Sequence, residues 1–226
     1  MEKAIVFWSG GKDSAFALYK AKQNPKLEII GLVTVLNKEA GNSAVHNLAE
    51  AIIEKQTAQT GLPLRKMWLN ATPSNHKYEQ ALLEVYEQLL NEGVSTVIYG
   101  DIFLEDIKSY RENLAIKAGH KILFPLWKLN SVKLMDEFIE TGFKAVTCNI
   151  NTEVLNEAFL GKSVDKKFFE ELPAEVDPAG ENGEFHTFCF DGPVFKKPVT
   201  YKMGLKHFSE VSLESRKHTS AYIDIY

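Results

Sequence analysis

Ser9-Gly10-Gly11-Lys12-Asp13-Ser14 stands between an apolar run and a helical pattern, and this position decides the fold. The run Ala4–Trp8 predicts a buried β-strand, and Ala15–Lys20 predicts the first turns of a helix. Two adjacent glycines let the main chain approach an anion, and amides at a helix start lack partners within the helix. A lysine charge and two serine hydroxyls add to these amides. The stretch therefore predicts a pyrophosphate-binding loop.

Two familiar phosphate loops are excluded by spacing. A Walker A loop needs Gly-x4-Gly-Lys-Ser/Thr, but Asp13 follows Lys12 and the first glycine is missing. A dinucleotide fingerprint needs a third glycine, which does not follow here. The remaining alternative is an ordinary Gly-Gly turn in which Asp13 helps to start the helix.

Composition bounds the class of protein. The 226 residues, 45% of them hydrophobic and 25% charged, are enough for one large soluble domain or two small ones. A net charge of −4 argues against broad nucleic-acid binding. Cys148 and Cys189 form no CxxC pair, which argues against a zinc ribbon, an iron–sulfur site or a disulfide scaffold and fits a reducing compartment. The N-terminal apolar stretch is too short for a signal peptide or membrane span, so we expect a cytoplasmic protein.

The first half of the chain alternates strand and helix patterns. The strands expected after the first are Leu27–Leu36, Leu64–Leu69, Val94–Tyr99 and Lys121–Phe124, and the clearest helix is Tyr78–Leu90. This alternation predicts an α/β fold with a parallel sheet covered on both faces and ligands at the carboxyl ends of its strands. Gly100-Asp101 follows the fourth strand as SGGKDS follows the first. We therefore expect both to face one crevice.

The pattern changes near residue 130. The segments expected there are a helix from Asn130 and Ser131 to about Glu140, a strand over Phe143–Ile150, a helix over Ser163–Leu172, a turn-rich stretch over Pro173–Gly183, and extended segments over Thr200–Glu214 and Ala221–Tyr226. They predict a smaller α+β domain. The predicted division is a nucleotide-binding domain over 1–130 and a substrate-binding domain over 131–226.

Further motifs give a family resemblance. They are Tyr99–Asp106 (YGDIFLED) followed by Tyr110-Arg111-Glu112, Phe124–Trp127 (FPLW), and Leu172–Phe188 (LPAEVDPAGENGEFHTF) closing on Asp191-Gly192-Pro193. Together with SGGKDS, from residue 3 to about 195, they resemble the N-type ATP pyrophosphatases, a PP-loop family that contains diphthine–ammonia ligase. The resemblance implies a Rossmann-like fold of the HUP (adenine nucleotide alpha hydrolase-like) class, ATP and Mg²⁺ as cofactors, and a homodimer.

The resemblance also implies a reaction. ATP is split into AMP and pyrophosphate while a substrate carboxylate, small or protein-borne, is adenylated, and ammonia then displaces AMP to leave an amide. In the diphthamide-making branch the second motif reads closer to GEGGEFET, whereas here Asn182 replaces a glycine and His186 a glutamate. The GENGEFHT form resembles a second branch, linked to corrinoid salvage. Ala179 stands where that branch has a cysteine, so no covalent role is assigned there.

Candidate roles follow for the nucleotide half of the site. Lys12, together with the hydroxyls and amides of the PP-loop (Ser9–Ser14), is expected to bind the phosphates of ATP, and Gly100 is expected to lie beside them. Asp101 suits Mg²⁺ or substrate, and its alternative is a turn or helix-cap aspartate. Arg111 suits a phosphate or carboxylate, and its alternative is a surface pair with Glu105, Asp106 or Glu112.

The acid-rich second motif is the candidate ammonia site. In an extended segment Glu184 and His186 point to the same side, and the flanking glycines allow a tight loop around Glu181. Together the three side chains suit receiving ammonium and removing its proton. The alternatives are a divalent metal site and a salt-bridged hairpin. His46 suits ribose or substrate or is a lone surface histidine, and Cys189 is expected to be a buried small hydrophobe.

Two rival functions remain open. One is another PP-loop chemistry, tRNA modification or sulfur transfer, against which the missing CxxC pair and basic surface count. The other is a sensor that binds ATP without turnover. No glutaminase segment is recognised, so ammonia is expected free or from a partner.

Overall fold

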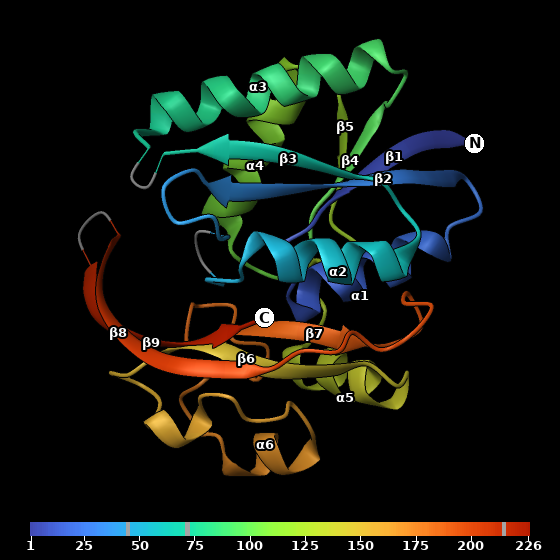
Figure 1. The fold of residues 1–226 in the computed structure, drawn as a ribbon. Coiled ribbons are helices and arrows are strands. Elements are labelled where there is room, and N and C mark those ends of the chain that lie inside the picture. Colours follow the sequence, from blue (N-terminus) through green and yellow to red (C-terminus); the bar gives the residue numbers. More distant parts are fainter. Residues whose placement is uncertain (44–45, 71–72, 214–215) are drawn as a thin grey trace.

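A computed structural model describes residues 1–43, 46–70, 73–213 and 216–226, with side chains at 210–218 left out (Figure 1). The first half forms a parallel sheet in the order β3-β2-β1-β4-β5. Its strands are β1 (Glu2–Phe7), β2 (Leu27–Asn37), β3 (Leu64–Leu69), β4 (Thr96–Ile98) and β5 (Lys121–Leu123). The helices between them are α1 (Lys12–Lys22), α2 (Glu50–Thr60), α3 (Asn75–Asn91) and α4 (Glu105–Lys117). The predicted α/β, Rossmann-like sheet is confirmed.

The second half forms an antiparallel sheet in the order β7-β6-β9-β8. Its strands are β6 (Lys144–Asn151), β7 (Phe185–Asp191), β8 (Met203–Leu213) and β9 (Arg216–Ile225). With them come α5 (Ser131–Glu140), the 3₁₀ turn η1 (Glu157–Phe159) and α6 (Lys166–Glu171). The predicted smaller α+β part is confirmed.

Some predicted boundaries need correction. The fourth strand is only Thr96–Ile98, because the Val94 amide still donates to the Leu89 carbonyl of α3 and Tyr99 lies beyond the strand. The helix expected over Ser163–Leu172 begins only at Lys166, where Asp165 accepts a hydrogen bond from the Phe168 amide and caps it. The last strand is longer than Ala221–Tyr226, since it begins at Arg216. Glu214, the expected end of the preceding segment, lies outside the described residues.

Alternating residues of β1 supply two separate cores. Ala4, Val6 and Trp8 point to the face covered by α1 and α2, whereas Ile5 and Phe7 point to the face covered by α3 and α4. A strand covered on both faces has no polar side, which explains why the run Ala4–Trp8 is apolar throughout. Helices α1 and α2 lie between the two sheets (Figure 1).

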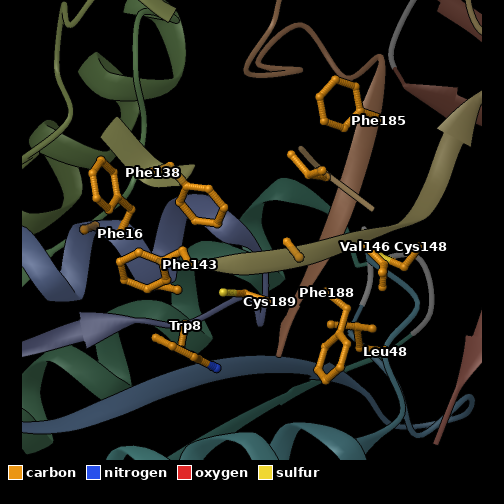
Figure 2. Packing of buried hydrophobic residues seen from close by; sticks show 14 of the residues in the cluster. Trp8, Phe16, Leu48, Phe138, Phe143, Val146, Cys148, Phe185, Phe188 and Cys189 are labelled. Atoms are coloured by element: carbon orange, nitrogen blue, oxygen red, sulfur yellow. The ribbon is translucent and has the colours of Figure 1, made fainter. Parts of the chain in front are cut away.

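The core around α1 and α2 continues into the antiparallel sheet without a break. It joins Trp8 and Phe16 to Phe138, Phe185 and Phe188 from α5 and β7 (Figure 2). The Phe16 ring meets Phe138 edge-on, with 5.7 Å between their centroids. Removing apolar side-chain surface from water is the main stabilising contribution to such a fold, at about 25 cal/mol per Å² of surface buried. The two sheets therefore share one hydrophobic core.

No described helix is both long and apolar enough to span a bilayer.

Candidate active site

The PP-loop lies between β1 and α1, as predicted. Gly10 has φ 86°, a conformation that glycine adopts at little cost. Ser9 Oγ accepts a hydrogen bond from the Gly11 amide at 3.2 Å, and Ser14 Oγ donates to the Gly11 carbonyl at 3.0 Å. The loop is therefore held in an open turn before the first amides of α1, where the helix dipole favours an anion.

Strand β7 anchors this loop from the other sheet. The Lys12 amide donates to Thr187 Oγ1 at 3.0 Å, and the Cys189 amide donates to the Gly10 carbonyl at 2.9 Å. These contacts join residues more than 170 positions apart in the chain. Sequence reasoning missed the anchoring role of Thr187, although it belongs to the quoted second motif.

Gln56 of α2 is a second anchor that sequence reasoning missed. Its side chain is fully buried, and its Oε1 accepts a hydrogen bond from the indole N–H of Trp8 at 2.7 Å. Its amide nitrogen donates to the carbonyls of Gly10 and Cys189 at 2.8 and 2.6 Å. One side chain thus joins β1, the PP-loop and β7, and no local pattern in the sequence marks it.

Lys12 points from α1 toward the loop before β7 that carries Glu181 and Glu184, called here the acid-rich loop. Its side chain is only 3% exposed, and its ammonium lies 2.9 Å from both carboxylate oxygens of Asp13. It also donates to the Ala179 carbonyl and lies 5.3 Å from the centre of the Phe185 ring. This charge therefore lies where the PP-loop meets the loop before β7.

The carboxyl end of the fourth strand lies beside the loop that follows the first, as expected for Gly100-Asp101 and SGGKDS. A Cβ on Gly100 would lie 2.9 Å from the backbone of Asp13, so the end of β4 touches the start of α1. Arg111 Nη1 lies 3.0 Å from Asp101 Oδ2, and the guanidinium lies 4.3 Å from the centre of the Tyr99 ring. Burial raises the pKa of Asp101 and the charge of Arg111 opposes this.

These contacts decide two alternatives that the sequence left open. Arg111 pairs with Asp101 and not with its acidic neighbours on α4; Lys108 pairs with Glu112 and Lys128 with Glu105. Asp101 does not cap α4, which begins at Glu105 after Leu104.

Glu181 crosses from the acid-rich loop to the end of β4. Its Oε1 accepts hydrogen bonds from the Ile102 amide at 2.8 Å and from Phe103 at 3.4 Å. Burial raises the pKa of this carboxyl to about 7; the Ile102 hydrogen bond and Lys12 oppose that rise, and Asp13 and Asp101 add to it. Glu181 can therefore gain or lose a proton near neutral pH.

Glu184 is buried inside its own loop, 7% exposed. Its Oε1 accepts from the Asp177 amide and from the Asn182 side-chain amide, both at 3.0 Å. Its Oε2 is buried with no hydrogen-bond partner among the described residues. A buried carboxylate oxygen without a donor is costly, so a cationic donor would stabilise it.

His186 meets His46 above the PP-loop. Their ring centroids are 5.0 Å apart, and a Cβ on Gly11 would lie 2.6 Å from His46 Nε2. Burial lowers the pKa of His46 well below its usual value, and the charges of His186 and Lys12 add to this effect. His46 is therefore paired within the site, and the lone surface alternative is wrong.

The three side chains of the acid-rich motif thus make different contacts: Glu181 with β4, Glu184 within its loop and His186 with His46. No group of three or more His, Cys, Asp or Glu side chains in the described part of the chain could hold a metal ion. Both cysteines are buried, and burial raises the pKa of each thiol, as expected for small hydrophobes.

Two family models of known proteins match the two halves of the chain. The family models named diphthamide synthase N-terminal domain and diphthamide synthase C-terminal domain match residues 2–122 and 130–218. The chain belongs to the diphthamide synthase family. Both the SGGKDS loop and the acid-rich loop lie within the matched ranges.

Relatives named diphthine–ammonia ligase match most of the chain. The Schizosaccharomyces pombe protein is 27% identical over 92% of this chain, and the chain covers 38% of that protein's length. The Danio rerio protein is 27% identical, covering 87% of this chain and 85% of its own length. The Homo sapiens protein is 26% identical, with 84% and 79% covered.

Among solved structures, one similar chain is the U34-tRNA thiolase NcsA from Methanococcus maripaludis, which holds a [4Fe-4S] cluster. It has a TM-score of 0.36 and 17% identity, over 62% of this chain and 57% of that one. A similarity this low says nothing about substrate.

Proposed function

We propose that this protein is an AMP-forming, ATP-dependent ligase that adenylates a substrate carboxylate and amidates it with ammonia. The observation that carries the proposal is the meeting of two loops of opposite chemistry. The PP-loop offers a helix start and Lys12, whose ammonium donates to Ala179 of the acid-rich loop, and that loop places Glu181 against the end of β4. Membership of the family and relatives named diphthine–ammonia ligase support it.

The first step joins the substrate carboxylate to ATP. A carboxylate oxygen attacks the α-phosphorus, the bond to the α–β bridging oxygen breaks, and pyrophosphate leaves with the electron pair. Negative charge develops on that oxygen, and the donors that the PP-loop side chains offer are the buried Lys12 ammonium and the Ser9 and Ser14 hydroxyls. Fixed donors in a site that excludes water stabilise such charge by several kcal/mol.

Mg²⁺ fits the same end of β4. Asp101 Oδ2 is buried and receives no well-aligned hydrogen bond from the residues that the structure describes, although Arg111 lies beside it. An oxygen ligand of this kind, together with phosphate oxygens, is what Mg²⁺ prefers. Mg²⁺ would neutralise part of the phosphate charge, and Asp101 would hold it while Arg111 and Gly100 fix the position of the carboxylate.

The second step needs neutral ammonia. Ammonium reaching the buried Oε2 of Glu184 gains a partner for its charge. Its proton passes to Glu181, whose pKa of about 7 suits a base near neutral pH, or to His186. Ammonia then attacks the acyl carbon, the bond to the AMP oxygen breaks, and AMP leaves as the amide forms.

Sulfur transfer is the less well supported alternative function for a PP-loop protein of this kind. It needs a thiolate or a cluster held by thiolates, but both cysteines of the chain are buried with raised thiol pKa values. We therefore propose a small or protein-borne carboxylate as the substrate, with Mg²⁺ and ammonia, in the cytoplasm.

The products of ATP test the proposal. The purified protein is incubated with MgATP and a pooled metabolite extract, with and without ammonium, and the nucleotides are separated by chromatography. We expect AMP and pyrophosphate in equal amounts, with sustained turnover only when ammonium is present. ADP and phosphate, or ATP left intact, would rule the proposal out. Pyrophosphate release that requires tRNA would favour tRNA modification.

A further inference from the structure

Two neighbouring imidazoles lie at the PP-loop, where one of them touches Gly11. His46 comes from the segment between β2 and α2, and His186 from β7, with ring centroids 5.0 Å apart. His46 Nε2 lies against Gly11, so that even a methyl group on this glycine would be only 2.6 Å away. We call these two residues the imidazole pair. A phosphate chain held by the loop amides would lie directly beside it.

Two basic groups act on His46. Among the described residues they are Lys12 from α1, which is itself paired with Asp13, and His186 from β7. The helix start adds about half a positive charge. Burial and these charges lower the pKa of His46 well below its usual value, so this imidazole is neutral at neutral pH.

Bound ATP reverses this charge. A unit negative charge about 5 Å away raises the proton affinity of an imidazole roughly hundredfold at an effective dielectric constant near 20. MgATP brings about two such charges, whereas the adenylate that remains after pyrophosphate leaves brings about one. The proton affinity of a group at this position therefore rises on ATP binding and falls when pyrophosphate leaves.

We propose that the imidazole pair lies against the polyphosphate of bound ATP and takes up a proton from solvent when ATP binds. The added proton places a cation beside the phosphates during adenylation. When pyrophosphate leaves, the pair returns the proton to solvent or to a pyrophosphate oxygen. A neutral imidazole is then present when ammonium must lose a proton. The inference rests on the proposed function, but the proton uptake itself requires only that ATP binds the PP-loop.

Proton uptake can be measured without the carboxylate substrate. Magnesium α,β-methylene-ATP, which cannot be split at the reacting bond, is titrated into the protein by calorimetry near neutral pH in buffers of different ionisation enthalpy. The dependence of the binding enthalpy on the buffer gives the number of protons bound. We expect uptake of roughly half a proton or more in the wild type.

Matched variants assign the proton. His46→Asn and His186→Asn are each expected to lose most of the uptake. His207→Asn is the control, because His207 pairs with Asp224 on the β8–β9 hairpin and is expected to keep the wild-type value. Glu181→Gln measures the share of proton uptake that belongs to Glu181, a carboxyl whose pKa is raised to about 7. Wild-type uptake in both histidine variants would overturn the proposal.

Magnetic resonance of ring-labelled histidines tests the wild type directly. Adding the analogue is expected to shift the ring signals of His46 and His186 toward the protonated form and to leave those of His76 and His207 in place. Unmoved signals from the pair on analogue binding would overturn the proposal while leaving amidation intact. Absence of analogue binding would instead overturn the PP-loop assignment and the proposed function with it.

Discussion

Lys12 is the residue on which ATP cleavage should depend most. It is the buried ammonium next to the PP-loop amides, held between Asp13 and the Ala179 carbonyl. Lys12→Ala removes the charge that stabilises the leaving pyrophosphate, so we expect pyrophosphate release to fall about a hundredfold to a thousandfold. Lys22→Ala, at the exposed end of the same helix, is the control and should leave the rate unchanged.

Glu184 should act after ATP is cleaved. Glu184→Gln keeps the shape of the side chain and an acceptor for the Asp177 amide but removes the charge at Oε2. We expect ATP affinity to stay within about twofold, while amide formation per AMP falls at least tenfold. Equilibrium binding of ATP and the ratio of amide to AMP measure the two effects. If Lys12→Ala and Glu184→Gln weakened ATP binding equally, the separate roles of the PP-loop in ATP cleavage and of the acid-rich loop in amidation would be contradicted.

The raised pKa of Glu181 makes stability depend on pH. Between its ordinary value of 4.5 and the folded value of about 7, the folded protein holds this proton more tightly than the unfolded chain. Unfolding then releases the proton, so the free energy of unfolding falls as pH rises through this window. Glu181→Gln can still accept the Ile102 hydrogen bond but does not titrate. We expect the variant to be more stable than wild type by on the order of 2 kcal/mol at about pH 8, after allowance for solvent screening.

Urea unfolding near pH 5 and pH 8 checks this expectation for Glu181. The stability difference between variant and wild type should appear on going from the lower to the higher pH. Parallel loss of stability in both proteins would show that Glu181 titrates near its ordinary pKa.

At the scale of elements, α2 holds the PP-loop against β7 through Gln56. Gln56→Leu leaves the Trp8 indole N–H and the Gly10 and Cys189 carbonyls buried without this partner. Each unsatisfied group costs about 1–3 kcal/mol, so we expect a loss of roughly 2–4 kcal/mol in stability, together with weaker ATP binding. Gln59→Leu, almost one turn further along the helix, is the matched control. Urea unfolding and ATP titration measure both, and equal stability of the two variants would contradict the role of Gln56.

The sequence predicted those elements whose signals are local. The strand, loop and helix around Ser9–Ser14 could be read because an apolar run, two glycines and a helical pattern follow one another directly. The Arg111–Asp101 pair and the reach of Glu181 to Ile102 could not, because each depends on how separate loops meet. The same holds for Gln56 and Thr187, which act on a loop far away in the chain.

At the scale of the whole molecule, one of the two hydrophobic cores is shared by both sheets. Strand β7 hydrogen-bonds to the PP-loop, and the cluster from Trp8 to Phe188 crosses from one sheet to the other. We therefore expect residues 1–130 and 131–226 to unfold together. Scanning calorimetry should give a single transition in which the calorimetric and van't Hoff enthalpies agree. Two separated transitions would show that the predicted halves are independent folding units.

The fate of ammonia nitrogen tests the central claim most directly. The protein is incubated with MgATP, heavy-nitrogen ammonium and the pooled extract, and mass spectrometry follows AMP, pyrophosphate and labelled amides. The account predicts an amide that carries the heavy nitrogen, formed in an amount equal to AMP and absent with Lys12→Ala. AMP and pyrophosphate formed without any labelled amide would contradict it.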